Sequence, residues 1–483
     1  MNNNDLCRLL EVLVALPKET EWVEFKANFH SEEEIGERLS ALSNSACLMD
    51  KSFGYLVFGV EDVTHKIIGT SFRAKLAKKG NEELELWLLN RLNPKVDYEI
   101  YDFDTPDGKH ISLFRIPSAT SRPVSFLNVE YIRVGSITKR LQSFPDKESK
   151  IWKKAANKNL SDLMVKERLS SQDVIRLLSV EAYFNLMKIP LPQTQEGIIE
   201  RFEQEHIIKP EELGWSITQL GALLFAKDLS DFGVLSRKGI RVIVYKGKNK
   251  LDTVREQSFT AGYALCLDNA VEWINGQLPA NEVIGEMLRR NVSMYPKLAI
   301  RELIGNMVIH QDFGELGTPM VEIYSDRIEL SNPGLPLVNT DRFIDEYQSR
   351  NEALADIMRR MGFCEEKGSG MDKVVSMVEV FQLPPVRIKV SENRTSVTME
   401  SYKPWSQMDK SERVLACYQH TCLKYVSNDL TSNQSLRERF KIEDRNYPMI
   451  SRLLKDTIEA GLIKDANPEE KSPRNRRYIP YWG

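Results

Sequence analysis

The feature that most constrains the fold is the nearly all-apolar run Tyr55–Val60. Such a run is typical of a central strand that is buried on both faces, so other elements must cover it. Before it, Trp22–Ala27 alternates as a strand does, with Glu24 on one face and Val23 on the other. Ser31 then provides the cap of an amphipathic helix. This strand–helix–strand order predicts an α/β domain at the start of the chain.

The length of 483 residues is too great for a single hydrophobic core. No stretch is apolar enough to cross a bilayer, and Met1–Asp5 lacks the basic start of a signal peptide, so we expect no membrane partner. The six cysteines are scattered without a CxxC pair, which indicates neither a disulfide framework nor a cysteine zinc site. A cytoplasmic location is therefore expected. The net charge of −3 means that any nucleic-acid partner must be bound by local basic patches.

The pattern along the chain predicts a multidomain protein of α/β and α+β class with four domains. Residues 1–143 form the α/β sheet domain, and 144–235 form a helical linker, rich in Lys and Glu, that would also suit dimerisation. Residues 236–405 form an α+β unit that begins with a strand near Arg241, and 406–483 form a small helical domain with a hairpin. From the helical middle we expect a homo-oligomer.

Three acidic residues stand at strand ends in the first domain. Glu19 and Glu24 flank the start of the first strand, and Asp62 follows the buried one. If the two strands are neighbours, the carboxylates converge and can bind Mg²⁺ or Mn²⁺, which activates water beside a phosphodiester. Lys26, on the Glu24 face, would then contact the phosphate. The alternative is that these acids are solvated strand ends, as most surface carboxylates are.

These residues resemble the Schlafen AlbA-like domain over about residues 10 to 140. The resemblance rests on Glu19, on Glu24-Phe25-Lys26, on the strand Gly54–Asp62 and on the closing Tyr131–Gly135. It implies a metal-dependent endoribonuclease that cuts tRNA or other structured RNA, with Glu19, Glu24 and Asp62 as metal ligands. One departure is that Asn44 is not followed by two glycines. Many bacterial relatives are described only as DNA-binding regulators, so the resemblance leaves cleavage open.

A second candidate site lies on one helix. Glu302, Asn306 and His310 are spaced four residues apart and therefore line one side of a helix, while Leu303 and Met307 lie on another side. The oxygen of the Asn306 side chain can ligate Mg²⁺ between nucleotide phosphates, and Glu302 can orient or deprotonate the attacking water. The alternative is a partly exposed amphipathic helix without a ligand.

The segments that follow resemble the divergent GHKL ATPase domain, an α/β sandwich, over about residues 240 to 400. Two strands precede Asn332-Pro333-Gly334, and then come Ser349-Arg350-Asn351 and Gly368-Ser369-Gly370. The resemblance implies an ATP site, because a glycine loop lets backbone N–H groups approach phosphate. The expected cofactor-binding residues are Asn306, His310, Asn332, Gly334, Gly368, Ser369 and Gly370. The usual Asp-x-Gly-x-Gly box is replaced at Asn332, so binding without turnover and a purely structural domain stay open.

The last segment resembles a winged helix. Three helices are expected at Ser411–Val426, Ser435–Phe440 and Asp444–Ala460, followed by a hairpin that ends at Pro480. In that fold the third helix enters the DNA major groove and the wing contacts the backbone. The candidate nucleic-acid contacts are Arg445, Asn446, Arg452, Lys455, Lys471, Arg474, Arg476 and Arg477. The alternative is a protein-binding winged helix with a solvated wing, which Asp444 and the other acids nearby favour.

Two functions follow from these patterns. In the first, the protein is a metal-dependent endonuclease, on tRNA or other RNA, whose activity is governed by nucleotide binding in the GHKL-like domain. The resemblance would suit a role in stress response or phage defence (antiviral defence). In the second, the protein is an ATP-responsive DNA-binding transcriptional regulator without nuclease activity. The carboxylates Glu19, Glu24 and Asp62 favour the first function, and the winged helix favours the second.

Overall fold

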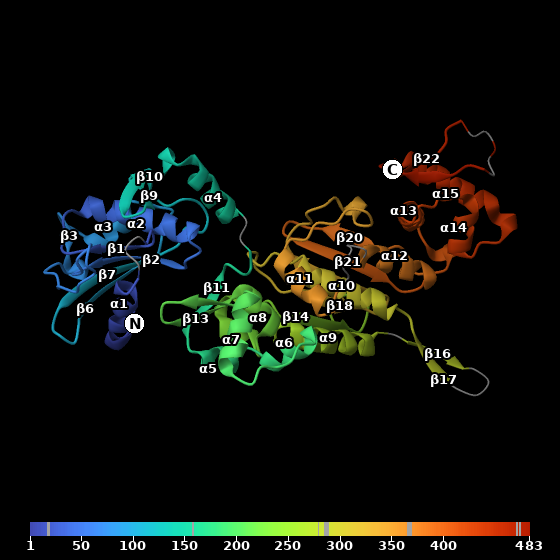
Figure 1. The fold of residues 1–483 in the computed structure, drawn as a ribbon. Helices are drawn as coiled ribbons and strands as arrows, with labels where there is room; N and C mark the ends of the chain where they lie inside the picture. The colour runs from blue at the N-terminus through green and yellow to red at the C-terminus, as the bar shows by residue number, and fades with distance from the viewer. Residues whose placement is uncertain are drawn as a thin grey trace. The chain divides into compact units, whose positions relative to one another are not determined.

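The computed structural model describes residues 1–16, 20–156, 159–278, 280–284, 289–364, 370–469, 472 and 475–483. It divides into two compact units, which are described separately (Figure 1). The first unit holds Met1–Leu163, Glu167–Ser170 and Lys209–Ser216, and the second holds the remainder. Both combine sheets with helices, so the predicted multidomain α/β and α+β class is confirmed. Within the described part of the chain, no helix has the length and apolarity needed to cross a membrane.

The central sheet of the first unit has the strand order β1-β2-β7-β6. These strands are β1 (Val23–Lys26), β2 (Phe53–Phe58), β7 (His110–Pro117) and β6 (Glu99–Asp104). β1 and β2 run parallel with Glu24 opposite Leu56, and the other pairs are antiparallel. Every residue of β2 is buried, as its apolar run predicts. The strand that contains Glu24 and the strand that precedes Asp62 are thus direct neighbours.

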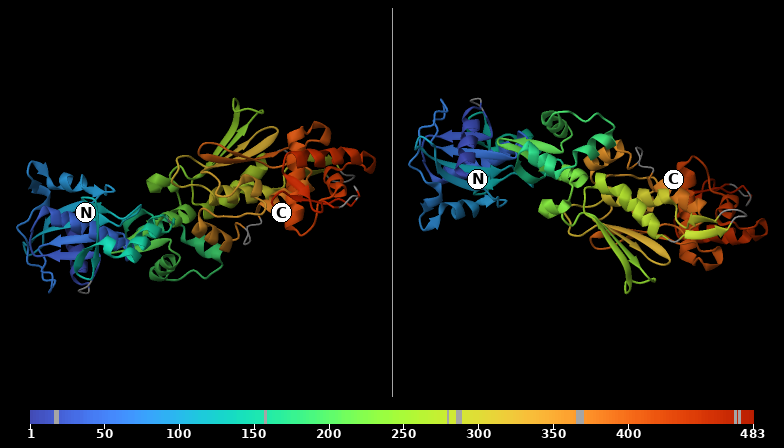
Figure 2. Two further views of the ribbon diagram at one scale, coloured as in Figure 1. Left: turned by 90° about the horizontal axis from the view of Figure 1, so that it is seen from above. Right: turned by 90° about the horizontal axis from the view of Figure 1, so that it is seen from below.

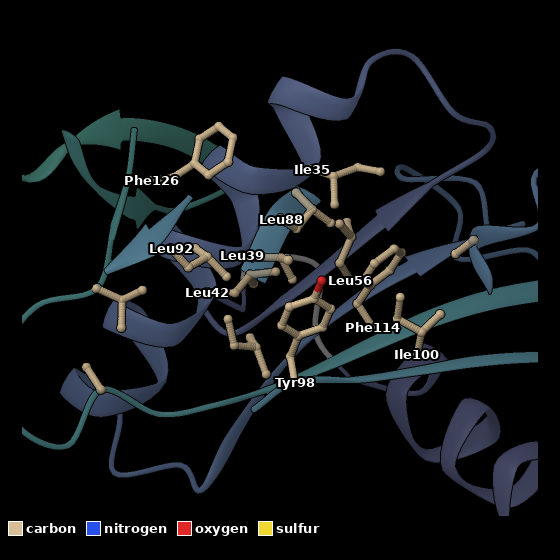
Figure 3. Packing of buried hydrophobic residues seen from close by; sticks show 14 of the residues in the cluster. Ile35, Leu39, Leu42, Leu56, Leu88, Leu92, Tyr98, Ile100, Phe114 and Phe126 are labelled. Atoms are coloured by element: carbon tan, nitrogen blue, oxygen red, sulfur yellow. The ribbon is translucent and has the colours of Figure 1, made fainter. Parts of the chain in front are cut away.

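Two layers cover this sheet. On one face, α2 (Glu32–Leu48) packs in a hydrophobic cluster with residues of the sheet, including Leu39, Leu56 and Phe114 (Figure 3). A second sheet, of β10 (Ile137–Arg140), β9 (Val129–Val134), β8 (Ser125–Phe126) and β5 (Leu92–Asn93), shares that cluster. The other face carries α1 (Asn3–Val14) in a separate cluster. The oxygen of the Ser31 side chain accepts from the Glu34 N–H, which confirms the predicted cap of α2.

Asn44 joins α2 to the second sheet. Its buried amide donates to the carbonyls of Val124 and Tyr131, both at 2.8 Å, and its oxygen accepts from the Val124 N–H at 2.7 Å. Asn44 therefore has a structural role. This role does not require the two glycines that usually follow the asparagine in Schlafen AlbA-like domains.

The stretch predicted as wholly helical, 144–235, also contains strands. Its helices are α4 (Pro145–Ala156), α5 (Ser171–Leu177), α6 (Val180–Met187), α7 (Gln195–Gln204) and α8 (Gln219–Phe225). Between them a three-stranded sheet has the order β11-β13-β12, with β11 (Met164–Leu169), β13 (Gly214–Thr218) and β12 (Ile208–Glu211). The prediction missed these strands because they are short, and two of them carry charged residues, with none of the long alternation that marks a strand.

The second unit is built on a six-stranded sheet of order β15-β14-β18-β19-β21-β20. These strands are β15 (Thr253–Phe259), β14 (Ile240–Tyr245), β18 (Met320–Ile323), β19 (Arg327–Pro333), β21 (Arg394–Glu400) and β20 (Arg387–Val390). Its helices include α9 (Tyr263–Gln277), α10 (Lys297–Ile309), α11 (Glu352–Arg360) and α12 (Gly370–Val380), and β16 (Ala280–Ile284) pairs with β17 (Arg289–Ser293). Both views in Figure 2 show the yellow helix α10 on one side of this sheet.

The elements expected at the end of the chain are present. They are α13 (Lys410–Val426), α14 (Asn433–Phe440), α15 (Tyr447–Glu459) and the hairpin of β22 (Ile463–Asp465) with β23 (Tyr478–Pro480). We call residues 410–483 the C-terminal module. Asp409 and Glu412 cap α13 reciprocally, and a hydrophobic cluster that includes Leu436, Leu454 and Tyr478 holds the helices to the hairpin.

Candidate functional sites

Glu24 lies at the centre of a buried ionic cluster in the first unit. Its side chain is only 4% exposed, and it accepts from Arg38 Nε at 2.9 Å and from an Nη of Arg133. The Lys26 ammonium lies 3.2 Å from the same carboxylate. Arg38 comes from α2 and Arg133 from β9, so the central sheet, α2 and the second sheet meet at this one acid.

Lys26 connects Glu24 to the second predicted acid. Its Nζ is 3.3 Å from Asp62 Oδ2, and the Asp62 side chain is 52% exposed. The structure therefore brings Glu24, Lys26 and Asp62 together at the ends of β1 and β2, as the strand pairing predicts. Glu19 lies outside the described residues, so the predicted set of three carboxylates stays a prediction.

This arrangement does not form an open site for a divalent ion. A cation between Glu24 and Asp62 would have to displace the Lys26 ammonium, and the guanidinium groups of Arg38 and Arg133 would repel it. Across the described positions, no cluster of three His, Cys, Asp or Glu side chains could hold a metal. With Lys26 in this position, the described residues leave no site for a resident Mg²⁺ or Mn²⁺ between Glu24 and Asp62.

The candidate residues of the second unit line one pocket. Glu302, Asn306 and His310 follow one another along α10 and its carboxyl end, and Asn332 of β19 and Gly370 of α12 line the same cavity. The cavity has an empty volume of about 1060 Å³, open solvent at its mouth included. Much of its remaining wall is apolar: Leu303, Met307, Leu330, Leu335, Leu337, Val338, Phe343, Met371 and Val397.

Gly370 makes a close approach between α12 and α10. A Cβ at this position would lie 3.0 Å from Glu302 Oε2 and 3.4 Å from Asn306 Nδ2. The first turn of α12, whose N–H groups have no partner within the helix, therefore begins beside the two polar side chains of α10. Gly368 and Ser369, also predicted to approach phosphate, lie outside the described residues.

Asn332 and Gly334 shape another wall. The Asn332 amide donates to the Pro333 carbonyl at 3.1 Å and to the His310 carbonyl at 3.4 Å, which ties β19 to the end of α10. Gly334 has φ of +108°, and a Cβ there would be 2.8 Å from Asp312 Cβ, so the turn requires glycine. Asn332 lines the pocket, whereas Gly334 supports the wall.

His310 is a neutral side chain in this pocket. Burial, with a smaller effect from the Arg350 guanidinium, lowers the pKa of His310 to about 4. Its ring meets that of Tyr347 edge to face, with centroids 5.9 Å apart. At neutral pH His310 therefore contributes hydrogen bonding and packing, and no positive charge for phosphate.

Arg350 supplies the cation of the pocket, a role the sequence interpretation missed although it noted Ser349-Arg350-Asn351. Its Nη1 is 3.0 Å from Asp312 Oδ2, and its Nη2 donates to the Leu335 carbonyl at 2.7 Å. A guanidinium held at both Nη atoms has a fixed orientation, so the second N–H group on each Nη atom can be presented to an anion. The signal for Arg350 was its place in the motif order, since nothing local marks it.

Those predicted nucleic-acid contacts of the C-terminal module that the structure describes are solvent-exposed. The described ones are Arg445, Asn446, Arg452, Lys455, Arg476 and Arg477. Two of them have acidic neighbours: Arg445 Nε lies 2.5 Å from Glu443, and Lys455 Nζ lies 3.7 Å from Glu459. Exposed pairs of this kind are weak, so they reduce the positive potential of the α15 face without removing it. Lys471 and Arg474 lie outside the described residues.

Comparison with protein families identifies two domains. Residues 19–142 match the family model described as "Schlafen, AlbA_2". The first unit carries a Schlafen AlbA_2 domain. Residues 317–399 match a second family model, described as "Putative ATP-dependent DNA helicase recG C-terminal", which is an ATPase-like domain. The resemblance to the Schlafen AlbA-like domain is thereby confirmed, and the GHKL resemblance is confirmed as an ATPase-like domain, whereas the winged helix stays a prediction. The Schlafen AlbA_2 match covers Glu24, Lys26 and Asp62.

Whole-chain comparisons add little. No curated protein matches the chain. One solved structure, the DIP2311 protein from Corynebacterium diphtheriae, is 16% identical, with 99% of this chain and 97% of that chain covered and a TM-score of 0.44. A TM-score this low supports no inference about fold or function.

Proposed function

We propose that the protein binds ATP in the pocket of its second unit and uses it in acting on nucleic acid. The observation that carries this proposal is the convergence of Glu302, Asn306, His310, Asn332 and Gly370 on one cavity. These residues come from α10, β19 and α12. If α10 were only an amphipathic helix without a ligand, nothing would require polar residues of the other two elements to meet its polar side. The ATPase-like and Schlafen AlbA_2 domains support the link between nucleotide and nucleic acid.

Each part of the pocket has a task in this proposal. The amide N–H groups at the start of α12 bind phosphate oxygens, and Arg350 adds a positive charge. Asn306 would hold a Mg²⁺ ion that comes with the nucleotide, which neutralises phosphate charge. Glu302, next to Gly370, orients the attacking water and accepts its proton, and the apolar wall packs against the base.

Isothermal titration of the full chain with ATP and Mg²⁺ tests the proposal. We expect saturable binding by the wild type and by Glu302→Ala, with hydrolysis lost only in the variant. Asn306→Ala should weaken binding, and the effect should shrink when Mg²⁺ is withheld. Glu272→Ala, at an exposed position on α9, is the matched control and should behave as the wild type. Absence of ATP binding by the wild type would refute the proposal.

The second candidate function is endonucleolytic cleavage of RNA by the Schlafen AlbA_2 domain. It is favoured by the meeting of Glu24, Lys26 and Asp62 at one sheet edge. Here Lys26 binds the phosphate, and the half-exposed Asp62 is the acid that a substrate can reach. Metal dependence comes to this candidate only through the family resemblance: Glu19 would complete the acidic set, and a bound ion would have to displace the Lys26 ammonium from Glu24 and Asp62.

Total tRNA incubated with the protein tests this second candidate. We expect defined fragments with Mn²⁺ or Mg²⁺, fewer with a chelator, and none from Asp62→Ala. Glu61→Ala, the adjacent exposed acid, is the control and should still cut. Fragments that persist in Asp62→Ala would rule out this assignment.

The alternative is an ATP-responsive regulator that binds DNA through the C-terminal module. It is favoured by the exposed cations of α15 and of the hairpin, Arg452 and Arg476 among them. Gel shifts should then find a preferred duplex, and Arg476→Ala with Arg477→Ala should weaken binding to all duplexes alike, because phosphate contacts carry no sequence choice. A preferred duplex without any tRNA cleavage would favour this alternative over the nuclease.

A further inference from the structure

One wall of the nucleotide pocket is formed by the segment 340–347. Phe343, Glu346 and Tyr347 line the cavity from this segment. It begins with a single 3-10 turn, Thr340–Arg342, and has no regular structure after it up to α11. A wall of this kind depends on contacts outside itself to keep its shape.

Those contacts come from the C-terminal module. The Tyr418 hydroxyl donates to the Asp341 carbonyl at 2.6 Å. The guanidinium carbon of Arg342 lies 4.7 Å from the centre of the Trp482 ring, a cation–π geometry. Trp482 Nε1 in turn donates to the Tyr418 hydroxyl at 3.1 Å, so the two aromatic residues form one unit.

Packing reinforces these polar contacts. Ile344, between the pocket residues Phe343 and Glu346, is buried in the hydrophobic core of the C-terminal module together with Tyr418 and Cys422. The segment therefore lies between the pocket and the module. A displacement of the module would move Phe343 and Tyr347 as well.

A second wall is held in the same way. Gly370 begins α12 beside the pocket, and one turn later Val375 is buried in the core of the module. Further along, Glu379 pairs with His420 at 3.0 Å and with Arg439 at 3.4 Å. Both partners are almost fully buried, so the hydrogen bond with His420 and the ion pair with Arg439 fix α12 to α13 and α14.

We infer that Tyr418 and Trp482 are positioning residues of the nucleotide pocket, which act through the segment 340–347. It follows that ATP binding and docking of the C-terminal module are coupled. The inference rests on the proposed ATP binding and adds a means of regulation to it. Because coupling is reciprocal, ATP must stabilise the docked module by the same factor by which docking raises the affinity for ATP.

The test compares two tryptophans that pack against the same hydrophobic cluster, Trp482 of the module and Trp405 just before it, in the full-length chain. Trp482→Ala removes the contact with Arg342 and the hydrogen bond to Tyr418. Trp405→Ala is the matched control, because Trp405 packs against the same hydrophobic cluster through Phe440 and Arg413, which are not part of the segment 340–347. Tyr418→Phe is a milder variant that removes one hydroxyl and keeps the packing. Titration with ATP and hydrogen exchange of residues 340–347 are measured for each.

We expect Trp482→Ala to weaken ATP binding by about 5- to 150-fold, the usual range for such coupling. Without nucleotide, hydrogen exchange of residues 340–347 should also accelerate in Trp482→Ala and, to a lesser degree, in Tyr418→Phe. In Trp405→Ala the affinity for ATP and the exchange of residues 340–347 should stay near the wild-type values. This should hold even if the melting temperature falls as much as it does in Trp482→Ala.

Three results would overturn the inference. Wild-type affinity and exchange in Trp482→Ala would show that the wall does not need Trp482. Equal losses of ATP affinity in Trp405→Ala and Trp482→Ala would show a general effect of module stability. If Trp482→Ala does not fold, unchanged hydrogen exchange of residues 340–347 in Tyr418→Phe would refute the inference. If the wild type binds no ATP, the proposed function itself is refuted. If the wild type and Trp482→Ala bind ATP equally well, only the coupling is refuted.

Discussion

The buried position of Glu24 predicts that its removal destabilises the Schlafen AlbA_2 domain as well as changing its chemistry. Glu24→Ala leaves the Arg133 side chain, 3% exposed, without its carboxylate. Breaking a buried pair in this way costs about 3–5 kcal/mol of unfolding free energy, because the remaining charge is uncompensated. Arg38 is less affected, since its Nη1 also pairs with Glu34 at 2.7 Å.

Differential scanning calorimetry of the full chain measures this effect. For a domain of this size the loss corresponds to a fall of roughly 6–20 °C in the transition of the first unit. Glu34→Ala is the control, because that carboxylate is 43% exposed and its pair with Arg38 is worth less than about 1 kcal/mol. A Glu24→Ala transition within about 2 °C of the wild type would refute the reasoning, since Arg133 would then have found another partner.

Three further predictions concern the second unit. Gly370→Ala should weaken ATP binding, because the new Cβ contacts the Glu302 carboxylate, and it should change the melting temperature little, because Gly370 is the first residue of α12. Unchanged affinity in a titration would contradict this. Burial, and to a lesser extent the Asp345 carboxylate, raises the pKa of Asp372 from 3.8 to about 6, so stability is lost as the pH rises between these values. Asp372→Asn should therefore raise the melting temperature at pH 8 and hardly at pH 4. An equal gain at both pH values would contradict this cause. Gly334→Ala, at φ of +108° and against Asp312, should cost about 1–3 kcal/mol in denaturant unfolding, and a neutral result would mean that the turn can relax.

The polar ladder on α10 could be predicted from the sequence because all of it lies within one helix. Glu302, Asn306 and His310 share a side through their spacing alone, and the pocket confirms that they meet. Asn332 and Gly370 come from other elements, so their place in the same pocket was predicted by the resemblance. Arg350 was missed as a contributor, because its orientation depends on Asp312 and on a backbone carbonyl.

The surroundings of Glu24 could not be predicted from local patterns. Its cationic partners Arg38 and Arg133 lie on a helix and on a second sheet, and nothing in the E-F-K strand indicates them. The sequence interpretation therefore expected a carboxylate facing solvent or metal, whereas the structure places it in an ionic cluster. Strand pairing, by contrast, predicted that Glu24 and Asp62 would converge, and the structure places Lys26 between them.

The role of the C-terminal module beside the pocket was also not visible in the sequence. The helices and hairpin were predicted from periodicity and caps, with ends within a few residues of those in the structure. Their contact with the segment 340–347 depends on single side chains such as Tyr418 and Trp482, which carry no pattern. Domain boundaries, oligomeric state and a role in phage defence stay predictions.

The most direct test of the account is photo-crosslinking of the full chain with azido-ATP, followed by mapping of the labelled peptides. The account predicts saturable labelling of the apolar wall, in peptides that contain Leu335–Tyr347, and its loss when unlabelled ATP is in excess. Labelling confined to any other part of the chain, or none that ATP displaces, would contradict it.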